Sequence, residues 1–210
     1  MRRHWGDVRG ISPDFFVDWR RQLCERAAMS VPPFCIIGTP RSRTAWFARF
    51  LSHGAVLCEH EPSVQFASIE DMQKYFVPDR GASDSMLTLK WHELLAHGVK
   101  LLMVLRPRGD VLQSAIAAGL ATANSTAVLD HIIAATRRVP QSVPRWNYSD
   151  LTIRACADIF FECYGEAPPS AWLYHWYGTT VEADISSTAM QAHRNAKGLK
   201  SFYHELQGTD

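Results

Sequence analysis

The sequence predicts an α/β fold in which a mostly parallel β-sheet carries helices on both faces, giving three layers. Short apolar runs alternate with segments of helical periodicity, which is the pattern of parallel strands joined by crossover helices. The clearest run is 100–105 (KLLMVL), and another, 34–37 (FCII), ends at Gly38. Such continuous apolar runs are typical of strands buried on both faces. The 210 residues are 47% hydrophobic and 20% charged, so the chain can bury a core of this size.

The remaining elements are expected in the following order. Ser12 and Pro13 predict the start of an N-terminal helix, because they suit the capping and first helical positions. A helix is expected over Trp46–Leu51, after the first strand. The segment 78–85 is rich in glycine, serine and aspartate and is expected to be a loop. Further strands are expected at 55–58, 86–89 and 145–148, and further helices at 64–76, 110–120, 126–138, 151–164 and around 172–176.

The charge balance and residue patterns exclude several functional classes. Lys and Arg number 22 against 21 Asp and Glu, and this net charge of +1 gives no general attraction to nucleic acid or to a membrane surface. An anionic ligand must therefore be held by a local cationic site. The five cysteines form no C-x-x-C pair and the nine histidines form no H-E-x-x-H pattern, so we expect reduced thiols and no metal site. No segment has the pattern of a signal peptide or a membrane-spanning helix, so we expect a soluble, cytoplasmic protein.

The ends of the predicted strands indicate where a functional site lies. In a parallel sheet, ligands bind outside the carboxyl ends of the strands. The chain continues from four of the predicted strands at Gly38, Glu59, Lys90 and Arg106. Polar and charged residues gather at these four places, so we expect the functional site there.

The loop after the first strand predicts an anion site. Residues 38–46 read G-T-P-R-S-R-T-A-W and precede a helix. Backbone N–H groups at a helix start favour negative charge, Arg41 and Arg43 add guanidinium groups suited to phosphate or sulfate, and Ser42 and Thr44 add hydroxyls. The alternative is a helix capped by Ser42 with two solvated arginines. The loop also lacks the second glycine and the lysine of the nucleoside-triphosphate pattern G-x-x-x-x-G-K-[ST].

Residues 40–46 resemble the 5′-phosphosulfate-binding loop of sulfotransferases that use 3′-phosphoadenylyl sulfate. That loop reads P-[KR]-[ST]-G-T-[TS]-W or, in some bacterial branches, P-R-S-R-S-T. Here Arg43 stands where many members have glycine, and Ala45 stands where a hydroxyl residue is common. The resemblance implies a P-loop-type sheet, with Trp46 packing near the adenine. The loop residues to which it assigns cofactor binding are Arg41, Ser42, Arg43, Thr44, Ala45 and Trp46.

A second motif at the end of the strand 100–105 resembles the same family. The family's 3′-phosphate motif, R-[DN]-P-[KR]-D-x-x-x-S, has an arginine and a serine eight residues apart, and Arg106 and Ser114 keep that separation. The Asp or Asn after the arginine is missing here, and Gly109 shifts the inner register by one. The resemblance implies that Arg106 and Ser114 bind the 3′-phosphate. The alternative is that Arg106 pairs with Asp110 and that Ser114 has no role.

The resemblance implies transfer of a sulfuryl group from 3′-phosphoadenylyl sulfate to an acceptor hydroxyl or amine, with adenosine 3′,5′-bisphosphate as product. Such a transfer runs in line through a loose transition state, for which positioned cations and N–H groups suffice without a metal. Arg41 is expected to stabilise charge on the bridging oxygen as it leaves. The acceptor is expected to be a small molecule, a glycan or a lipid.

Three residues are candidates for the base that takes the acceptor proton. Glu61 is the first choice, because Glu61-Pro62 resembles the E-P of bacterial branches with the P-R-S-R loop. His92 is the second, because Lys90-Trp91-His92 resembles the K-T-H of the cytosolic branch, in which the histidine is the base. By the same resemblance Lys90 contacts the transferred group. His60 is the third candidate.

We expect one sulfotransferase-like domain over 1–210. It would comprise a helical extension at 1–32, a cofactor-binding core at 33–120 and a helical region at 121–210 that lines the acceptor site. The aromatic run Trp172–Tyr177 either lines that site or packs in the core. We expect no nucleic-acid partner and no stable membrane insertion. The alternatives are a P-loop kinase acting on a small molecule or nucleotide, and a non-catalytic nucleotide-binding module of the same fold.

Overall fold

A computed structural model describes residues 30–120 and 123–179. The fold formed by these residues belongs to a unit that begins at Val31. The helix expected to start at Ser12 and the whole segment from 180 onward lie outside the described residues.

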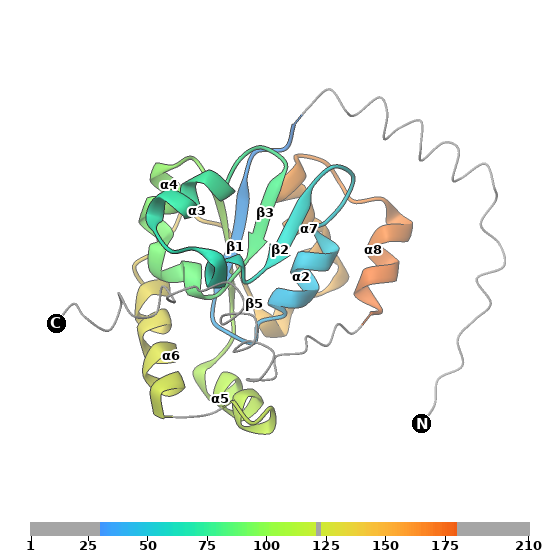
Figure 1. The fold of residues 1–210 in the computed structure, drawn as a ribbon. Helices are drawn as coiled ribbons and strands as arrows, with labels where there is room; N and C mark the ends of the chain where they lie inside the picture. The colour runs from blue at the N-terminus through green and yellow to red at the C-terminus, as the bar shows by residue number, and fades with distance from the viewer. Residues whose placement is uncertain (1–29, 121–122, 180–210) are drawn as a thin grey trace, which may run out of the picture. The chain divides into compact units, whose positions relative to one another are not determined.

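Five parallel strands form one sheet in the order β2-β3-β1-β4-β5 (Figure 1). The central strand β1 pairs with β3 on one side and β4 on the other, so that Cys35 lies opposite both Ala82 and Leu101. Helices cover both faces of this sheet, and the predicted three-layer α/β fold is therefore confirmed. The strands are β1 (Phe34–Gly38), β2 (Leu57–His60), β3 (Arg80–Ser83), β4 (Lys100–Leu105) and β5 (Arg145–Asn147).

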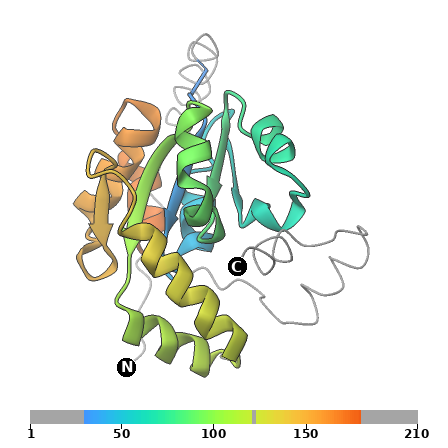
Figure 2. The same ribbon diagram turned by 90° about the vertical axis from the view of Figure 1, so that its left-hand side faces the viewer.

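The helices are distributed over two faces and one end of the sheet (Figures 1 and 2). One face carries α2 (Thr44–Phe50), α7 (Ile153–Tyr164) and α8 (Ser170–Tyr177). The opposite face carries α3 (Ile69–Tyr75), α4 (Trp91–Ala96), α6 (Ala123–Thr136) and the 3₁₀ helices η1 (Pro62–Gln65) and η2 (Met86–Lys90). The helix α5 (Arg108–Ala117) lies beyond the carboxyl ends of the strands, and the 3₁₀ helix η3 (Tyr148–Asp150) follows β5. None of the described helices is both long enough and apolar enough to cross a membrane.

The alternation of side chains along β1 divides the core into two layers. Phe34 and Ile36 belong to the layer under α2 and α7, where Phe47 and Phe160 are fully buried. Cys35 belongs to the other layer, which α3, η2 and α4 close. Each fully buried phenylalanine or isoleucine contributes about 1.5–3 kcal/mol. This burial on both faces fixes the strand from which the loop of the predicted site departs.

The third strand lies where the sequence predicted a loop, and the strand predicted at 86–89 is wrong, because those residues form η2. β3 has the sequence RGAS, which carries no apolar signal. Small residues are required there because the ring of Phe34 lies against the strand. A Cβ at Gly81 would come 2.4 Å from Cζ of Phe34. The packing of Phe34 from the neighbouring strand β1 therefore requires small residues in β3. Those small residues are also typical of loops, which is why the sequence predicted a loop here.

Several other predicted elements have shifted boundaries, and two of them bear on the site. β2 begins at Leu57 rather than at Ala55. The helix predicted over 64–76 is divided into η1 and α3, because the Ser68 hydroxyl accepts a hydrogen bond from the Asp71 N–H and so caps a new helix.

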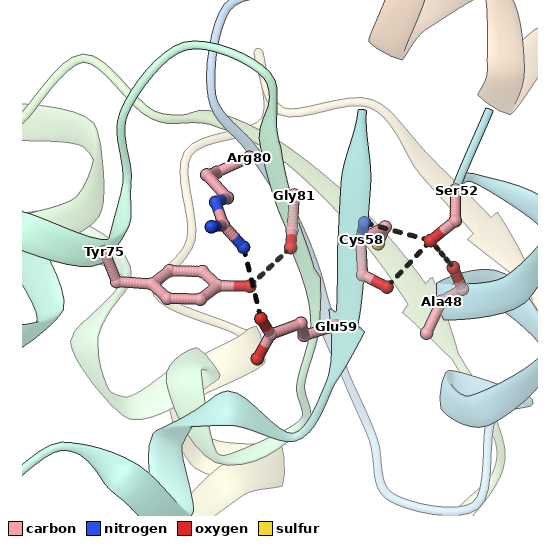
Figure 3. Close-up of polar contacts among 7 residues, drawn as sticks. All are labelled: Ala48, Ser52, Cys58, Glu59, Tyr75, Arg80 and Gly81. Atoms are coloured by element: carbon pink, nitrogen blue, oxygen red, sulfur yellow. Dashed lines mark hydrogen bonds and ion pairs between the residues drawn. The ribbon is translucent and has the colours of Figure 1, made fainter. Parts of the chain in front are cut away.

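Side-chain contacts on the α3 side anchor β3 to α3 and to β2 (Figure 3). The Tyr75 hydroxyl donates to the Gly81 carbonyl at 2.8 Å. Arg80 of β3 pairs with Glu59 of β2, with Nη1 and Oε1 3.3 Å apart. The Arg80–Glu59 pair thus adds a side-chain link between β2 and β3 to their backbone ladder.

A serine closes the free edge of β2 (Figure 3). The Ser52 hydroxyl accepts the Cys58 N–H at 3.0 Å, and it lies within donating distance of the carbonyls of Ala48 at 2.8 Å and Cys58 at 3.1 Å. An edge strand otherwise exposes unpaired backbone groups. This contact ties β2 to α2, and β2 thereby presents His60 and Glu61 at a fixed position.

Candidate functional site

Four segments meet at the carboxyl edge of the sheet. β1 continues into the loop 39–43, β2 into Glu61, β3 into Asp84 and β4 into Arg106. Because β1 lies between β3 and β4, its loop is flanked by the ends of both. The prediction that a strand ends before Lys90 is wrong, because Lys90 ends the helix η2.

The loop begins at a position that requires glycine. Gly38 has a φ of 138°, and a Cβ there would lie 1.9 Å from the carbonyl oxygen of Val104. The buried Thr88 hydroxyl accepts the Gly38 N–H at 2.8 Å and donates to the Gly38 carbonyl at 3.0 Å. This contact from η2 fixes the point at which the loop leaves the sheet.

The loop itself has a strained backbone. Arg41 and Arg43 are left-handed, with φ of 61° and 62°, a conformation that costs free energy in residues other than glycine. Ser42 between them is only 2% exposed, and its hydroxyl lies 3.0 Å from that of Thr39. Arg43 takes the N-cap position of α2, without a side-chain cap bond. The alternative of a helix capped by Ser42 is therefore wrong, and Ser42 instead maintains the shape of the loop.

Arg106 supports the loop from the end of β4. Its backbone N–H donates to the Thr39 hydroxyl at 2.6 Å, and its Nη1 donates to the Arg41 carbonyl at 2.8 Å. Its guanidinium lies 4.5 Å from the ring centroid of Tyr148, a favourable cation–π distance. Its Nε is shielded from solvent and has no hydrogen-bond acceptor among the described residues. The side chain thus contacts the loop rather than Asp110, contrary to the alternative considered above.

Ser114 brings α5 into contact with the same loop. The Nε of Arg41 donates to the Ser114 hydroxyl at 3.1 Å. Arg41 therefore contacts Arg106 through its main chain and Ser114 through its side chain. Arg108 lies outside this cluster: it is exposed and forms two hydrogen bonds, of 2.6 and 3.1 Å, with the Asp130 carboxylate of α6. The two sequence motifs thus meet through the arginine and serine that the resemblance singled out.

Glu61 faces this cluster from the end of β2. Its backbone is left-handed, with a φ of 49°, and its N–H donates to the Ser83 carbonyl at 3.1 Å. Burial, reinforced by the charge of Asp84, raises the pKa of Glu61 to about 7, and the charge of Arg41 acts in the opposite direction. A carboxyl group with this pKa is half ionised at neutral pH, which suits a general base.

Asp84 anchors the segments that follow β2 and β3. Its side chain is fully buried and accepts backbone N–H bonds from Ser63 at 2.9 Å, Met86 at 2.8 Å and Leu87 at 3.4 Å. Burial raises the pKa of Asp84, and these hydrogen bonds oppose the increase. Because both carboxylate oxygens are used in this way, Asp84 supports the backbone next to Glu61.

His60, the last residue of β2, lies between α2 and Glu61. Its Nε2 is 3.0 Å from Oγ1 of Thr44 and 3.7 Å from Oε1 of Glu61. Burial lowers the pKa of His60, which favours the neutral imidazole.

The structure places Lys90 and His92 beside Glu93. Nζ of Lys90 is 3.6 Å from Oε1 of Glu93, and Nδ1 of His92 is 3.0 Å from Oε2. The His92 side chain is 63% exposed. In the described part of the chain, no hydrogen bond or ion pair joins His92 to the loop 39–43 or to Glu61. Of the three candidate bases, the structure thus brings Glu61 and His60 to the loop and places His92 on α4.

Trp46 belongs to the core, and the tryptophans of α8 are partly buried against it. Trp46 is 3% exposed, stacks on Phe50 with ring centroids 4.7 Å apart, and donates its Nε1–H to the Trp176 carbonyl at 2.9 Å. It therefore offers no exposed ring face to an adenine. Trp172 donates to the Phe50 carbonyl at 2.9 Å, so α8 packs against α2, whereas Tyr174 is 69% exposed. Both tryptophans in the aromatic run thus pack against the core.

Sequence reasoning missed Tyr148 and Asp84. The Tyr148 ring contacts the guanidinium of Arg106 and lies 5.7 Å from that of Arg43. Its place at the end of the last predicted strand, 145–148, was the available signal. Asp84 was missed because β3 was not predicted, and an acidic residue at a strand end became visible only once that strand was located.

No protein-family model and no curated protein sequence matches the chain. Among residues 30–120 and 123–179, no group of three or more His, Cys, Asp or Glu side chains could hold a metal ion. A functional interpretation therefore depends on the chemistry of the cluster itself. It combines three arginines, Arg41, Arg43 and Arg106, with a carboxyl group that exchanges a proton near neutral pH.

Proposed function

We propose that this protein is a sulfotransferase that transfers a sulfuryl group from 3′-phosphoadenylyl sulfate to an acceptor hydroxyl or amine. The observation that carries the proposal is the double contact of Arg41. Its carbonyl accepts a hydrogen bond from Arg106, 65 positions away, and its side chain donates one to Ser114. In the resembled family, residues of these types hold the two anionic ends of one cofactor. Contact between the two motifs is what a shared cofactor requires.

The residues present fit a ligand with two anionic ends. Arg41 and Arg106 donate to neutral oxygens, and neither forms an ion pair with a carboxylate of the described residues. The unpaired Nε of Arg106 can donate to a phosphate. Arg43 and the Thr44 hydroxyl would hold the phosphosulfate end, where Ala45 contributes only its backbone N–H. When bound, the cofactor supplies the sulfuryl group.

Glu61 is placed to act as the base. Its carboxylate would take the proton of the acceptor hydroxyl or amine, a role that typically contributes 10²–10⁴-fold in rate. Arg41, whose charge acts on Glu61, keeps part of the carboxyl population ionised at neutral pH. The same guanidinium would stabilise negative charge that develops beside the loop.

Calorimetric titration with adenosine 3′,5′-bisphosphate tests the cofactor claim. We expect the wild-type protein to bind it, and Arg106→Ala to weaken binding by about 10- to 100-fold, because hydrogen bonds to charged groups are lost. Arg108→Ala is the matched control: Arg108 is two residues away but pairs with Asp130 at the surface, so binding should change less than twofold. Absence of binding at several hundred micromolar would overturn the proposal.

Transfer of radiolabelled sulfate from the cofactor tests the catalytic claim. Mixtures of sugars, phenols, amines and lipids serve as acceptors, and labelled product is separated from labelled cofactor. We expect label in at least one class of acceptor and loss of that label with Glu61→Gln. Bisphosphate binding without any transfer would instead favour a non-catalytic nucleotide-binding module.

A P-loop kinase is the second candidate, and the position of Asp84 is the observation that favours it. Asp84 follows the strand next to β1, where an acidic residue could serve a magnesium-bound nucleotide. Against this, its carboxylate is fully buried and accepts three backbone hydrogen bonds. A larger rise in thermal midpoint with Mg-ATP than with the bisphosphate would favour the kinase.

A further inference from the structure

The contacts of His60 link two parts of the proposed active site. The imidazole comes from β2, and its Nε2 is 3.0 Å from the hydroxyl of Thr44, the first residue of α2. The same nitrogen is 3.7 Å from the Glu61 carboxylate. One atom therefore lies between a proposed cofactor donor and the proposed base. The other groups acting on Glu61 are Arg41 of the loop and Asp84 after β3.

The two tautomers of a neutral His60 have opposite effects on Thr44. With the proton on Nδ1, Nε2 accepts the hydroxyl hydrogen of Thr44, and that hydrogen can no longer reach a bound anion. With the proton on Nε2, the imidazole donates to the hydroxyl oxygen of Thr44. The hydroxyl hydrogen is then free to donate to a phosphate or sulfate oxygen.

The Glu61 carboxylate favours the second tautomer. Nε2 lies 3.7 Å from Oε1 of Glu61, and a positively polarised N–H at this distance stabilises the ionised carboxylate, whereas a lone pair on the same nitrogen does not. An anion next to Thr44 favours the same tautomer, because it accepts the hydroxyl hydrogen. Anion binding at the loop and ionisation of the base therefore draw the His60 proton to the same nitrogen.

We propose that His60 is a positioning residue that, with its proton on Nε2, aims the Thr44 hydroxyl at the bound cofactor and favours the ionised form of Glu61. This inference rests on the proposed sulfotransferase function. It assigns His60 no proton transfer with the acceptor, and so differs from the role of base considered from the sequence. The imidazole acts only through Thr44 and Glu61.

A double-mutant cycle measures the link between His60 and Thr44. The probe is adenosine 3′,5′-bisphosphate, whose 5′-phosphate would lie at the loop, and binding is measured by calorimetry. We expect Thr44→Val and His60→Ala each to weaken binding about 3- to 10-fold. The affinity of the double variant for the bisphosphate should be within about twofold of that of the single variant that binds more weakly, because each substitution removes the same interaction. His60→Gln, whose side-chain amide can donate to Thr44, should stay within about twofold of wild type.

A spectroscopic measurement on the wild-type protein avoids any effect of substitution on folding. Ring ¹⁵N chemical shifts of His60 distinguish a proton on Nδ1 from one on Nε2. We expect the Nε2–H tautomer in the bisphosphate complex at neutral pH.

His97 is the control for the calorimetric binding series, because it contacts the Gln73 carbonyl and His97→Ala should leave the affinity unchanged.

The outcomes separate this inference from the proposed function. Wild-type protein that does not bind the bisphosphate would overturn both. Normal binding with additive effects of His60→Ala and Thr44→Val, or with the Nδ1–H tautomer in the complex, would overturn the role of His60 alone. Non-additive effects, rescue by glutamine and the Nε2–H tautomer together support it.

Discussion

The cluster around Glu59 and the cluster around Glu61 lie two residues apart in the chain but are built differently. Glu59 is within a strand and forms an ion pair with Arg80 at 3.3 Å, next to the hydrogen bond from Tyr75 to Gly81. Opposite charges there neutralise each other. A cluster of this kind joins two strands and has no spare charge for a ligand.

The cluster around Glu61 keeps its charges apart and its backbone strained. Glu61, Arg41 and Arg43 are three of the four described non-glycine residues with positive φ. Arg41 and Arg106 donate to neutral oxygens rather than to Glu61, whose pKa is raised to about 7. Strain and unneutralised charge cost stability, and such features concentrate where a protein binds or reacts. The comparison therefore indicates a structural role for the first cluster and supports the proposed functional role of the second.

Replacement of each glutamate by glutamine should show the largest difference between the two clusters. We expect Glu61→Gln to lower kcat for sulfuryl transfer by about 10²–10⁴-fold, because the amide cannot accept the acceptor proton. Glu59→Gln should change kcat less than about threefold. In the wild type, kcat/KM should fall about tenfold per pH unit below about 7, because Glu61 is then protonated. Steady-state kinetics across pH 5–9 measure both effects, and an unchanged acid limb in Glu61→Gln would contradict the assignment.

The two arginines provide the next test. Arg41→Met removes a charge that we expect to act on the reacting group, so kcat should fall by about 10²-fold, more than the loss of bisphosphate affinity. Arg80→Met removes the partner of Glu59 and should leave both quantities unchanged. Steady-state kinetics and calorimetry on the same preparations measure the change in kcat and the change in bisphosphate affinity separately. Equal losses of kcat and affinity in Arg41→Met would show that Arg41 only holds the cofactor.

The sequence predicted the strands correctly where burial on both faces of the sheet requires apolar residues. β1 and β4 are buried in the centre of the sheet and carry continuous apolar runs, which predicted them correctly. β3 is equally central but consists of small residues, because Phe34 fills the space beside Gly81. The small residues of β3 are explained by Phe34 on the neighbouring strand β1. The local sequence of β3 therefore could not predict that this segment is a strand.

The contacts within the candidate site were predictable where motifs kept their spacing, as Arg41, Arg106 and Ser114 do. Contacts that depend on tertiary structure were not predictable. The distance between His60 and Thr44 follows from how α2 packs beside β2, and the raised pKa of Glu61 follows from burial near Asp84. Neither the distance nor the raised pKa can be predicted from the local sequence pattern.

A smaller effect is expected on stability, with a sign that depends on pH. Folded Glu61 keeps its proton up to about pH 7, whereas an unfolded glutamate releases it near 4.5. Between these values the native state binds more protons, so wild-type stability falls as pH rises through this window. Glu61→Gln has no proton to lose, so at pH 8 it should exceed wild type by about 1–2 kcal/mol and should show little gain at pH 4. Denaturant unfolding at both pH values measures this, and an equal difference at each would contradict the raised pKa.

The smallest effect should come from the ion pair of the first cluster. Arg80 and Glu59 are both partly exposed, with side-chain exposures of 40% and 30%, so solvent screens their attraction. A double-mutant cycle with Arg80→Met and Glu59→Gln should give a coupling free energy of about 0.2–1 kcal/mol that is the same at pH 6 and pH 8. Unfolding in urea measures it. A coupling of more than about 2 kcal/mol would mean that this pair contributes much of the stability of β2, and that the edge strand depends on charge rather than on Ser52. A small coupling would leave the neutral hydrogen bonds of Ser52 as the main side-chain support of the strand that precedes Glu61.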